Sequence, residues 1–179
     1  ELQTSIADVN GNSVVVSFPV ASIDGPTVAI TEVLADPLGE EPAQEFVEIA
    51  NYGAAAFDIS GWMIDDGGDF NGDTLPQGTM LDAGQVALLV PASFDPASTA
   101  DPAPADDALV VFLEGTLGSA GLSNSEAETI ELYDAYGALV STYDGRLGLP
   151  AAGKSAARIR AEIPDGSKAA FGTAPIAST

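Results

Sequence analysis

The chain has 179 residues, of which 46% are hydrophobic and only 7% aromatic, with 27 acidic against 5 basic residues. This length predicts one domain, or one domain with an additional fragment, built around an aliphatic core. The sequence holds neither Cys nor His, which excludes thiol and Ser-His-Asp catalysis and the usual zinc, copper and haem sites. A net charge of −22 opposes a phosphate backbone, and no apolar run approaches the ~18 residues of a membrane span. We therefore expect neither nucleic-acid binding by this chain alone nor a membrane span.

The first 26 residues form a segment of their own, in which residues 13–18 are a predicted strand. Two interpretations stay open: the end of a preceding Ig-like domain with its linker, or an extra strand of the domain at 27–179. The turn before the strand carries oxygen ligands at alternate positions, which fit either a calcium site or an Asn-Gly hairpin turn. These residues are Asp8, Asn10 and Asn12.

Short runs rich in Val, Ile, Leu and Thr alternate with clusters of Gly, Pro, Asn and Asp along the rest of the chain. No segment shows a helical apolar period over three turns. Short strands separated by turns predict an all-β protein with an immunoglobulin-like β-sandwich. The predicted strands are 13–18, 27–33, 45–50, 61–65, 85–90, 108–113, 127–133, 138–143 and 155–160.

The pattern within two of these strands predicts how they are buried. In 45–50, Val47 and Ile49 point to one side while Glu45 and Glu48 lie on opposite faces, which predicts a strand mostly exposed on one of its faces. The run 108–113 is apolar throughout, and we expect it to be buried on both faces.

Two connections look irregular. Residues 91–107 are rich in Pro, Ala and Asp and predict an exposed loop with little intrinsic order. Its last acids, Asp106 and Asp107, are interpreted as solubilising charge. Residues 65–74 form a turn rich in Gly and Asp.

Charge is divided unevenly along the chain. Residues 1–145 hold 25 acids and no base, whereas all five bases lie between 146 and 168. The basic segment is either an interaction tail or a last strand that docks against the acidic body of its own domain. The composition suits a salt-adapted protein and an ordinary acidic secreted one equally well.

Several blocks occur in an order that resembles the lamin tail domain in its bacterial form, over about residues 27–179. The first blocks are Ile30-Thr31-Glu32-Val33, Glu45-Phe46-Val47-Glu48-Ile49-Ala50-Asn51 and Asp58-Ile59-Ser60-Gly61-Trp62-Met63-Ile64. The later blocks are Leu75-Pro76-Gln77-Gly78-Thr79, Leu81-Asp82-Ala83-Gly84-Gln85, Gly121-Leu122-Ser123-Asn124-Ser125, Glu128-Thr129-Ile130-Glu131-Leu132-Tyr133-Asp134 and Gly153-Lys154-Ser155-Ala156-Ala157-Arg158-Ile159.

This resemblance implies an immunoglobulin-like sandwich without catalytic residues. In bacteria it implies an accessory module of an exported protein, sometimes beside a hydrolase. The animal relatives bind nuclear partners, but this chain has no heptad coiled coil and its acidic body would repel DNA.

Individual residues support the same fold. Trp62 is the only Trp, and a lone Trp at a strand start predicts a core anchor. Gly78 and Gly84 predict turns with unusual backbone angles, and Asn51 and Asn124 predict side-chain caps on turns.

The sharpest candidate for chemistry is an acidic loop with oxygen ligands of the kind that Ca²⁺ prefers. It begins like an EF-hand, but Met80 stands where the bidentate Glu is required, so we predict at most a looser calcium site on a hairpin. The alternative is a solvated hairpin tip. The candidate metal ligands are Asp65, Asp66, Asp69, Asn71 and Asp73.

Three functions follow from these observations. The first is a non-catalytic module of an exported bacterial protein that binds a protein or a cell-surface glycan, placed extracellularly or on the cell surface and beside neighbouring domains. Glu1 at the start, without Met or leader, predicts a processed end or the boundary of a piece. The second is a structural spacer stabilised by calcium or salt. The third is a carboxylate-dependent hydrolase, against which the scarcity of aromatic residues argues because such sites need a substrate groove.

Overall fold

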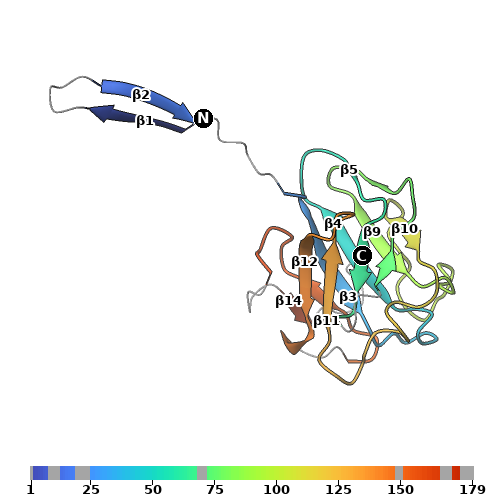
Figure 1. The fold of residues 1–179 in the computed structure, drawn as a ribbon. Coiled ribbons are helices and arrows are strands. Elements are labelled where there is room, and N and C mark those ends of the chain that lie inside the picture. Colours follow the sequence, from blue (N-terminus) through green and yellow to red (C-terminus); the bar gives the residue numbers. More distant parts are fainter. Residues whose placement is uncertain are drawn as a thin grey trace.

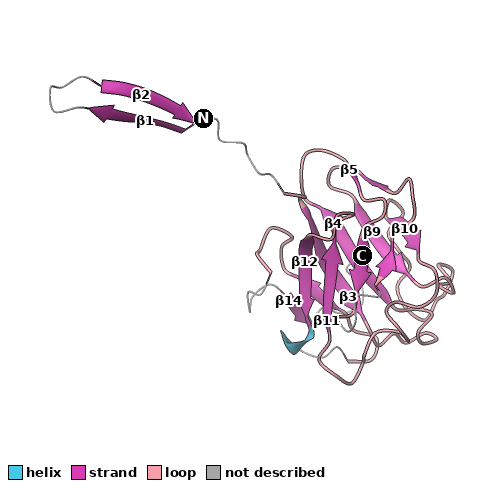
Figure 2. Cartoon of the chain, viewed as in Figure 1, coloured by secondary structure: helices cyan, strands magenta, loops and turns pink. Residues whose placement is uncertain are grey.

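The computed structural model of the chain describes residues 2–7, 13–18, 25–67, 72–147, 151–165 and 171–173. Over these ranges the protein consists of β-strands and one short 3-10 helix, η1 (Gly145–Leu147), as Figure 2 shows. No helix in this part of the chain has the length and apolar character needed to cross a membrane. The predicted all-β class is confirmed.

The first two strands, β1 (Leu2–Ala7) and β2 (Ser13–Phe18), pair antiparallel as a two-stranded sheet (Figure 1). Ala7 lies opposite Ser13, so the connection between the strands falls on residues 8–12. Asp8, Asn10 and Asn12 lie outside the described residues, and both interpretations of them stay predictions. Among the described strands, β1 and β2 pair only with each other.

Two larger sheets build the sandwich (Figure 1). One has the strand order β10-β9-β4-β3-β13-β14 and the other β12-β11-β6-β7. The short strands β5 and β8 form a separate two-stranded sheet. All neighbours are antiparallel except β9 and β10, which are parallel. The strands are β3 (Val28–Leu34), β4 (Phe46–Asn51), β5 (Phe57–Asp58), β6 (Met63–Asp65), β7 (Asp73–Thr74), β8 (Met80–Leu81), β9 (Val86–Val90), β10 (Leu109–Phe112), β11 (Thr129–Tyr133), β12 (Leu139–Asp144), β13 (Ala156–Arg158) and β14 (Phe171–Thr173).

Every predicted strand is present, and the ends differ by up to a few residues. The sequence missed β1, β5, β7, β8 and β14. Apart from β1, these are two or three residues long, which is too short for a pattern of alternation to stand out.

One core fills the space between the two large sheets. The largest fully buried side chains among the described residues are all Ile, Leu or Val, which confirms the aliphatic core predicted from the low aromatic content. Trp62 is 5% exposed and packs in this core, as predicted. The preceding residue, Gly61, has φ +71°, a conformation that favours glycine.

A smaller apolar cluster lies on the outer face of the six-stranded sheet. Its members alternate along the strands with core residues, so they point to the opposite side; they are Leu34, Phe46, Leu88 and Val90. Phe94 and Ala108 pack on this cluster from the loop at 91–108. The Asp101 carboxylate also accepts 2.8 Å hydrogen bonds from the N–H groups of Leu38 and Gly39. This loop is mostly exposed, as predicted, but it is anchored and covers part of the sheet.

The predicted burial of two strands is wrong. β4 is buried on both faces, with Glu48 only 9% and Phe46 only 8% exposed, because it lies between β3 and β9 and its outer side is covered. β10 is an edge strand rather than a doubly buried one, and Phe112 is 45% exposed. Alternation within a strand cannot reveal which neighbours and loops cover each face.

The basic carboxyl-terminal segment docks in the body of the domain through Arg158, which is 8% exposed. Its guanidinium joins both sheets, because it donates to Ile30 O on β3 and to Ser141 Oγ on β12. It also donates to Ile163 O, pairs with Asp165 and lies 4.7 Å from the centre of the Phe171 ring. The docking interpretation is confirmed for this residue, while Lys168 lies outside the described residues.

Candidate functional site

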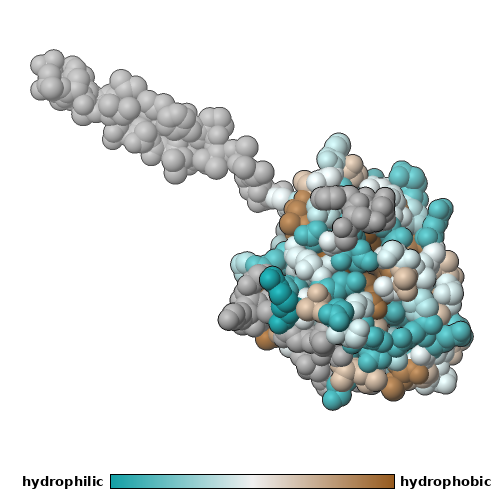
Figure 3. All heavy atoms as spheres, turned by 60° about the horizontal axis from the view of Figure 1, so that its bottom comes forward, coloured by the Kyte–Doolittle hydropathy of each residue, from teal (hydrophilic) through white to brown (hydrophobic). Residues whose placement is uncertain are grey.

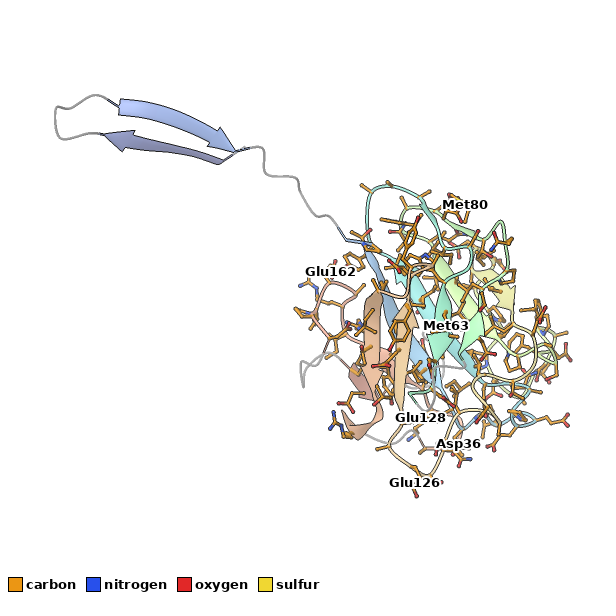
Figure 4. All side chains as sticks on the ribbon, viewed as in Figure 1. Asp36, Met63, Met80, Glu126, Glu128 and Glu162 are labelled. Atoms are coloured by element: carbon orange, nitrogen blue, oxygen red, sulfur yellow. The ribbon has the colours of Figure 1, made fainter. Side chains whose placement is uncertain are left out.

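A groove of about 430 Å³ lies beside β10. β10 forms one wall, and residues 76–80, which lead into β8, form the other. Each wall carries an exposed apolar side chain, Phe112 at 45% and Met80 at 47% exposure. Met80 lies at the end of the sandwich opposite Asp36 and Glu126 (Figure 4). That opposite end, brought forward in Figure 3, is mostly hydrophilic or neutral with small separate apolar areas.

The wall formed by β10 has a free backbone edge. β10 ends the six-stranded sheet and, among the described strands, pairs only with β9. The Leu113 N–H donates to Val90 O at 2.9 Å, and alternate residues of a parallel ladder bond to the same neighbour. Leu109 and Val111 therefore direct their backbone groups toward β9, whereas Val110 and Phe112 direct theirs away from it. The groove offers these N–H and C=O groups to a ligand.

The opposite wall is held by hydrogen bonds of its own. The Gly78 and Thr79 N–H groups donate to Ser60 Oγ at 2.9 and 3.2 Å, and Thr79 Oγ1 donates to Pro76 O at 2.7 Å. Gly78 has φ +83°, in agreement with the predicted turn. The Gly78 and Thr79 N–H groups are therefore already used within this wall, whereas the outward backbone groups of Val110 and Phe112 are not used by a described strand.

Acidic residues precede, follow or pair with the residues that line the groove, and we call these acids its rim. Asp106 and Asp107 precede β10, and Glu114 follows it; all are exposed. Across the groove, Asp58 is paired in register with Met80. Hydrogen bonds from the Ser60 hydroxyl and N–H lower the pKa of Asp58. Because residues 1–145 contain no base, the rim is negative at neutral pH.

This groove was not predicted from the sequence, although the strand at 108–113 and the acids Asp106 and Asp107 beside it were. The available signal was the strand itself, an apolar run with no charge and no proline. Natural sheet edges usually carry a charged residue or a proline, which protects them against pairing with another strand. An apolar run of this kind predicts a doubly buried strand. That β10 is an edge strand facing residues 76–80 follows only from the tertiary structure.

The structure describes three of the five predicted calcium ligands. Asp65, 4% exposed, accepts a 2.9 Å hydrogen bond from Gly67 N–H. Asp66 and Asp73 reach one further loop, where Ser119 N–H donates to Asp66 at 3.4 Å and Gly118 N–H donates to Asp73 at 2.9 Å. Asp69 and Asn71 lie outside the described residues.

The surroundings of Asp73 disfavour its negative charge. Burial raises its pKa, the Gly118 N–H opposes this, and the charges of Asp66 and Asp65 raise it further. Over the described ranges, no three acidic side chains are placed to hold a metal ion. A calcium site here would require Asp69 and Asn71, and it stays a prediction.

Two buried carboxylates, those of Glu45 and Glu48, form hydrogen bonds inside the domain. Burial raises the pKa of Glu45 and of Glu48 to about 7. The Leu122 N–H donates to Glu45 at 2.8 Å, and the Thr31 hydroxyl donates to Glu48 at 2.5 Å. Neither side chain lies in an open cleft, since they are 2% and 9% exposed.

A second pair of acids, Glu126 and Glu128, lines a cavity of about 10 Å³. This volume holds about one water molecule and no sugar. Neither pair of acids therefore supplies the substrate groove that a carboxylate-dependent hydrolase needs, and we do not propose that activity.

A family model of the lamin tail domain matches residues 21–145. The chain belongs to the lamin tail domain family. This is a family of Ig-like domains, in agreement with the β-sandwich described above, and it is consistent with a non-catalytic module. No curated protein matches the chain in sequence.

Residues that carry the family resemblance have structural roles in this lamin tail domain. Asn51 is fully buried, and its side-chain NH₂ group donates to the backbone carbonyls of Ala55, Leu81 and Asp82 at 2.7–3.2 Å. Its oxygen accepts from Thr27 Oγ1 and Gly53 N–H, so it caps a turn as predicted. Asn124 differs from the prediction, because its amide donates to the Glu41 carboxylate at 3.2 Å.

The basic segment lies beyond the part of the lamin tail domain that the family model matches, yet it belongs to the same sheet. β13 pairs with β3 on one side and β14 on the other. Gly153 N–H donates to Asp36 O at 2.6 Å, and the Ser155 hydroxyl donates to the buried Glu32 carboxylate. The folded unit therefore extends at least to β14.

Proposed function

We propose that this lamin tail domain is a non-catalytic interaction module that binds a protein partner through the groove beside β10. The observation that carries the proposal is that one groove contains both exposed apolar side chains, Phe112 and Met80, and backbone groups that no described strand uses. Apolar contacts and available hydrogen-bonding groups together are what a protein interface needs. Of the two partner classes that the sequence leaves open, this lining favours a protein over a glycan.

The proposal also covers the setting of the module. We place it in an exported bacterial protein, extracellular or on the cell surface and beside other domains. The support for this setting is the resemblance of its blocks to bacterial lamin tail domains and the acidic composition.

Selection from a phage-displayed library of random peptides, with the full chain immobilised, tests the binding function. We expect enriched peptides whose binding is lost in the double variant Phe112→Ser/Met80→Ser. The matched control is Ile159→Ser, because Ile159 is 64% exposed and directly follows β13, which three strands separate from β10 in the same sheet. Binding that survives the double variant, or a selection that enriches nothing, would contradict the proposal.

A calcium-stabilised spacer is the second candidate function. It is supported by two observations: Asp66 and Asp73 both accept hydrogen bonds from the same loop at residues 118–119, and the charge of Asp66 raises the pKa of Asp73. A divalent cation held with Asp69 and Asn71 would relieve this repulsion.

A further inference from the structure

We propose that the occupant of the groove is an extended, basic segment of a partner protein, which adds to the six-stranded sheet as a new strand beside β10. This inference rests on the proposed binding function and specifies the conformation and charge of the ligand. The observations that carry it are the direction of the β10 backbone, the lack of protection on this edge and the charge around it.

The backbone of β10 presents a template for a strand. Val110 and Phe112 point their N–H and C=O groups away from β9, as the ladder bond from Leu113 to Val90 shows. An extended peptide can satisfy all of these groups, because its own N–H and C=O groups alternate with the same spacing. A helix cannot do so, since its backbone groups bond within the helix.

The side chains around this edge suit a strand with apolar residues at alternate positions. Leu109 and Val111 pack toward the core, whereas Val110 packs toward the outer cluster. Phe112, next to it, stays 45% exposed. Alternate side chains of an added strand would cover Phe112 and Met80, while its backbone pairs with the edge.

β10 lacks the residue types that usually protect a sheet edge from pairing. Its residues are Leu109, Val110, Val111 and Phe112, without a charge, a proline or a bulge. Natural sheets block free edges with such features because an unprotected edge pairs with other chains. An edge that stays open in a protein of net charge −22 is therefore suited to a particular partner.

Charge selects a basic strand over a second copy of this chain. In an antiparallel pair of two β10 strands, Asp106 and Asp107 of one copy would come close to Glu114 of the other. Like charges in such positions are destabilising, and Asp58 adds a further negative charge at the rim. Lys or Arg residues flanking the apolar positions of a partner would instead be attracted to all of these acids.

The test uses the peptides selected from the random library on the full chain. We expect them to alternate apolar and polar residues and to carry an excess of Lys and Arg, and we expect their binding to weaken as NaCl is raised. The strongest peptide is then methylated on the amide nitrogens of every second residue, in each of the two possible sets. One set is expected to weaken binding about ten-fold or more for each lost hydrogen bond and the other set very little.

A variant of the protein tests the same contact from the other side. Val110→Pro removes an N–H that points away from β9, a position where an edge strand tolerates proline. We expect it to weaken peptide binding about ten-fold or more, whereas Val110→Ala, which keeps the N–H, weakens it much less. If Val110→Pro fails to fold, the two methylated peptide sets on the unaltered protein still decide.

The two proposals fail in different ways. Peptides that need Phe112 and Met80 but bind equally well with either methylated set would overturn strand addition and leave the binding function standing. Selected peptides that are acidic, or a chain that dimerises through β10 at low salt in analytical ultracentrifugation, would overturn the basic partner. Selected peptides whose binding does not depend on Phe112 and Met80 would overturn the proposed function itself.

Discussion

Replacing the buried Glu48 by glutamine should make the domain more stable at alkaline pH. Glu48 lies in the middle of β4, 9% exposed, with the Thr31 hydroxyl as a donor and the Glu32 charge nearby. Burial, opposed by the Thr31 hydrogen bond and reinforced by Glu32, raises its pKa from 4.5 to about 7. The folded state therefore binds a proton more tightly than the unfolded state does.

The direction of the pH effect follows from this difference. Below pH 4.5 Glu48 is protonated in both states, and its contribution to stability is complete. As the pH rises from 4.5 through 7, the unfolded state loses this proton first and the folded protein must finally hold a buried charge, which lowers the free energy of unfolding by up to roughly 3 kcal/mol in total. Glu48→Gln carries no charge at any pH, and its amide oxygen can still accept the Thr31 hydrogen bond. We expect it to gain about 2 kcal/mol at pH 8, or roughly 4–8 °C in Tm, and very little at pH 5.

The assay compares thermal melts of Glu48→Gln and the unaltered protein from pH 5 to pH 8 at constant ionic strength. Glu114→Gln is the matched control, because it removes the same charge from an exposed position and reports the general repulsion within an acidic protein. The reasoning is refuted if Glu48→Gln changes Tm by the same amount at both ends of the range. It is also refuted if the variant is less stable at pH 8, since the ionised carboxylate would then stabilise the fold.

Three further outcomes are expected. Arg158→Lys should lower the free energy of unfolding by about 3–5 kcal/mol in urea denaturation, because a single ammonium cannot replace the guanidinium that bonds to both sheets. A loss below about 1 kcal/mol would contradict this role. Asn51→Ala should cost about 2–4 kcal/mol, since three backbone carbonyls lose their donor, and an unchanged melt would show that water replaces the amide. CaCl₂ added to metal-stripped protein should raise Tm beyond NaCl of equal ionic strength, and Asp69→Asn/Asp73→Asn should abolish the difference; equal effects of the two salts would leave only diffuse charge screening.

The fold was predictable because its signals are local. Turn residues between short apolar runs located the strands of the sandwich, and Trp62, Gly78 and Asn51 have the structural roles expected of them. Strands as short as β5 and β8 were not predictable, because two residues carry no period. They form where neighbouring elements hold the chain extended.

The candidate site was less predictable than the fold. The acids around it and the apolar run of β10 are visible in the sequence, yet whether such a run is central or at an edge depends on which strands flank it. The same limit applies to Glu48, where the pattern suggested exposure. Glu48 is 9% exposed instead, because β4 lies between β3 and β9, where its neighbours in register are Glu32 and Leu88.

The sequence by itself determined the class of fold, the family and the exclusion of Cys- and His-based chemistry, because these depend on composition and on patterns within a few residues of each other. The tertiary structure alone decided which sheet edge stays open, which carboxylates are buried and which basic residue joins the two sheets. Those features arise where segments far apart in the chain meet, as Arg158 meets Ile30 and Ser141. No local pattern encodes the neighbours that burial, pKa and edge exposure depend on.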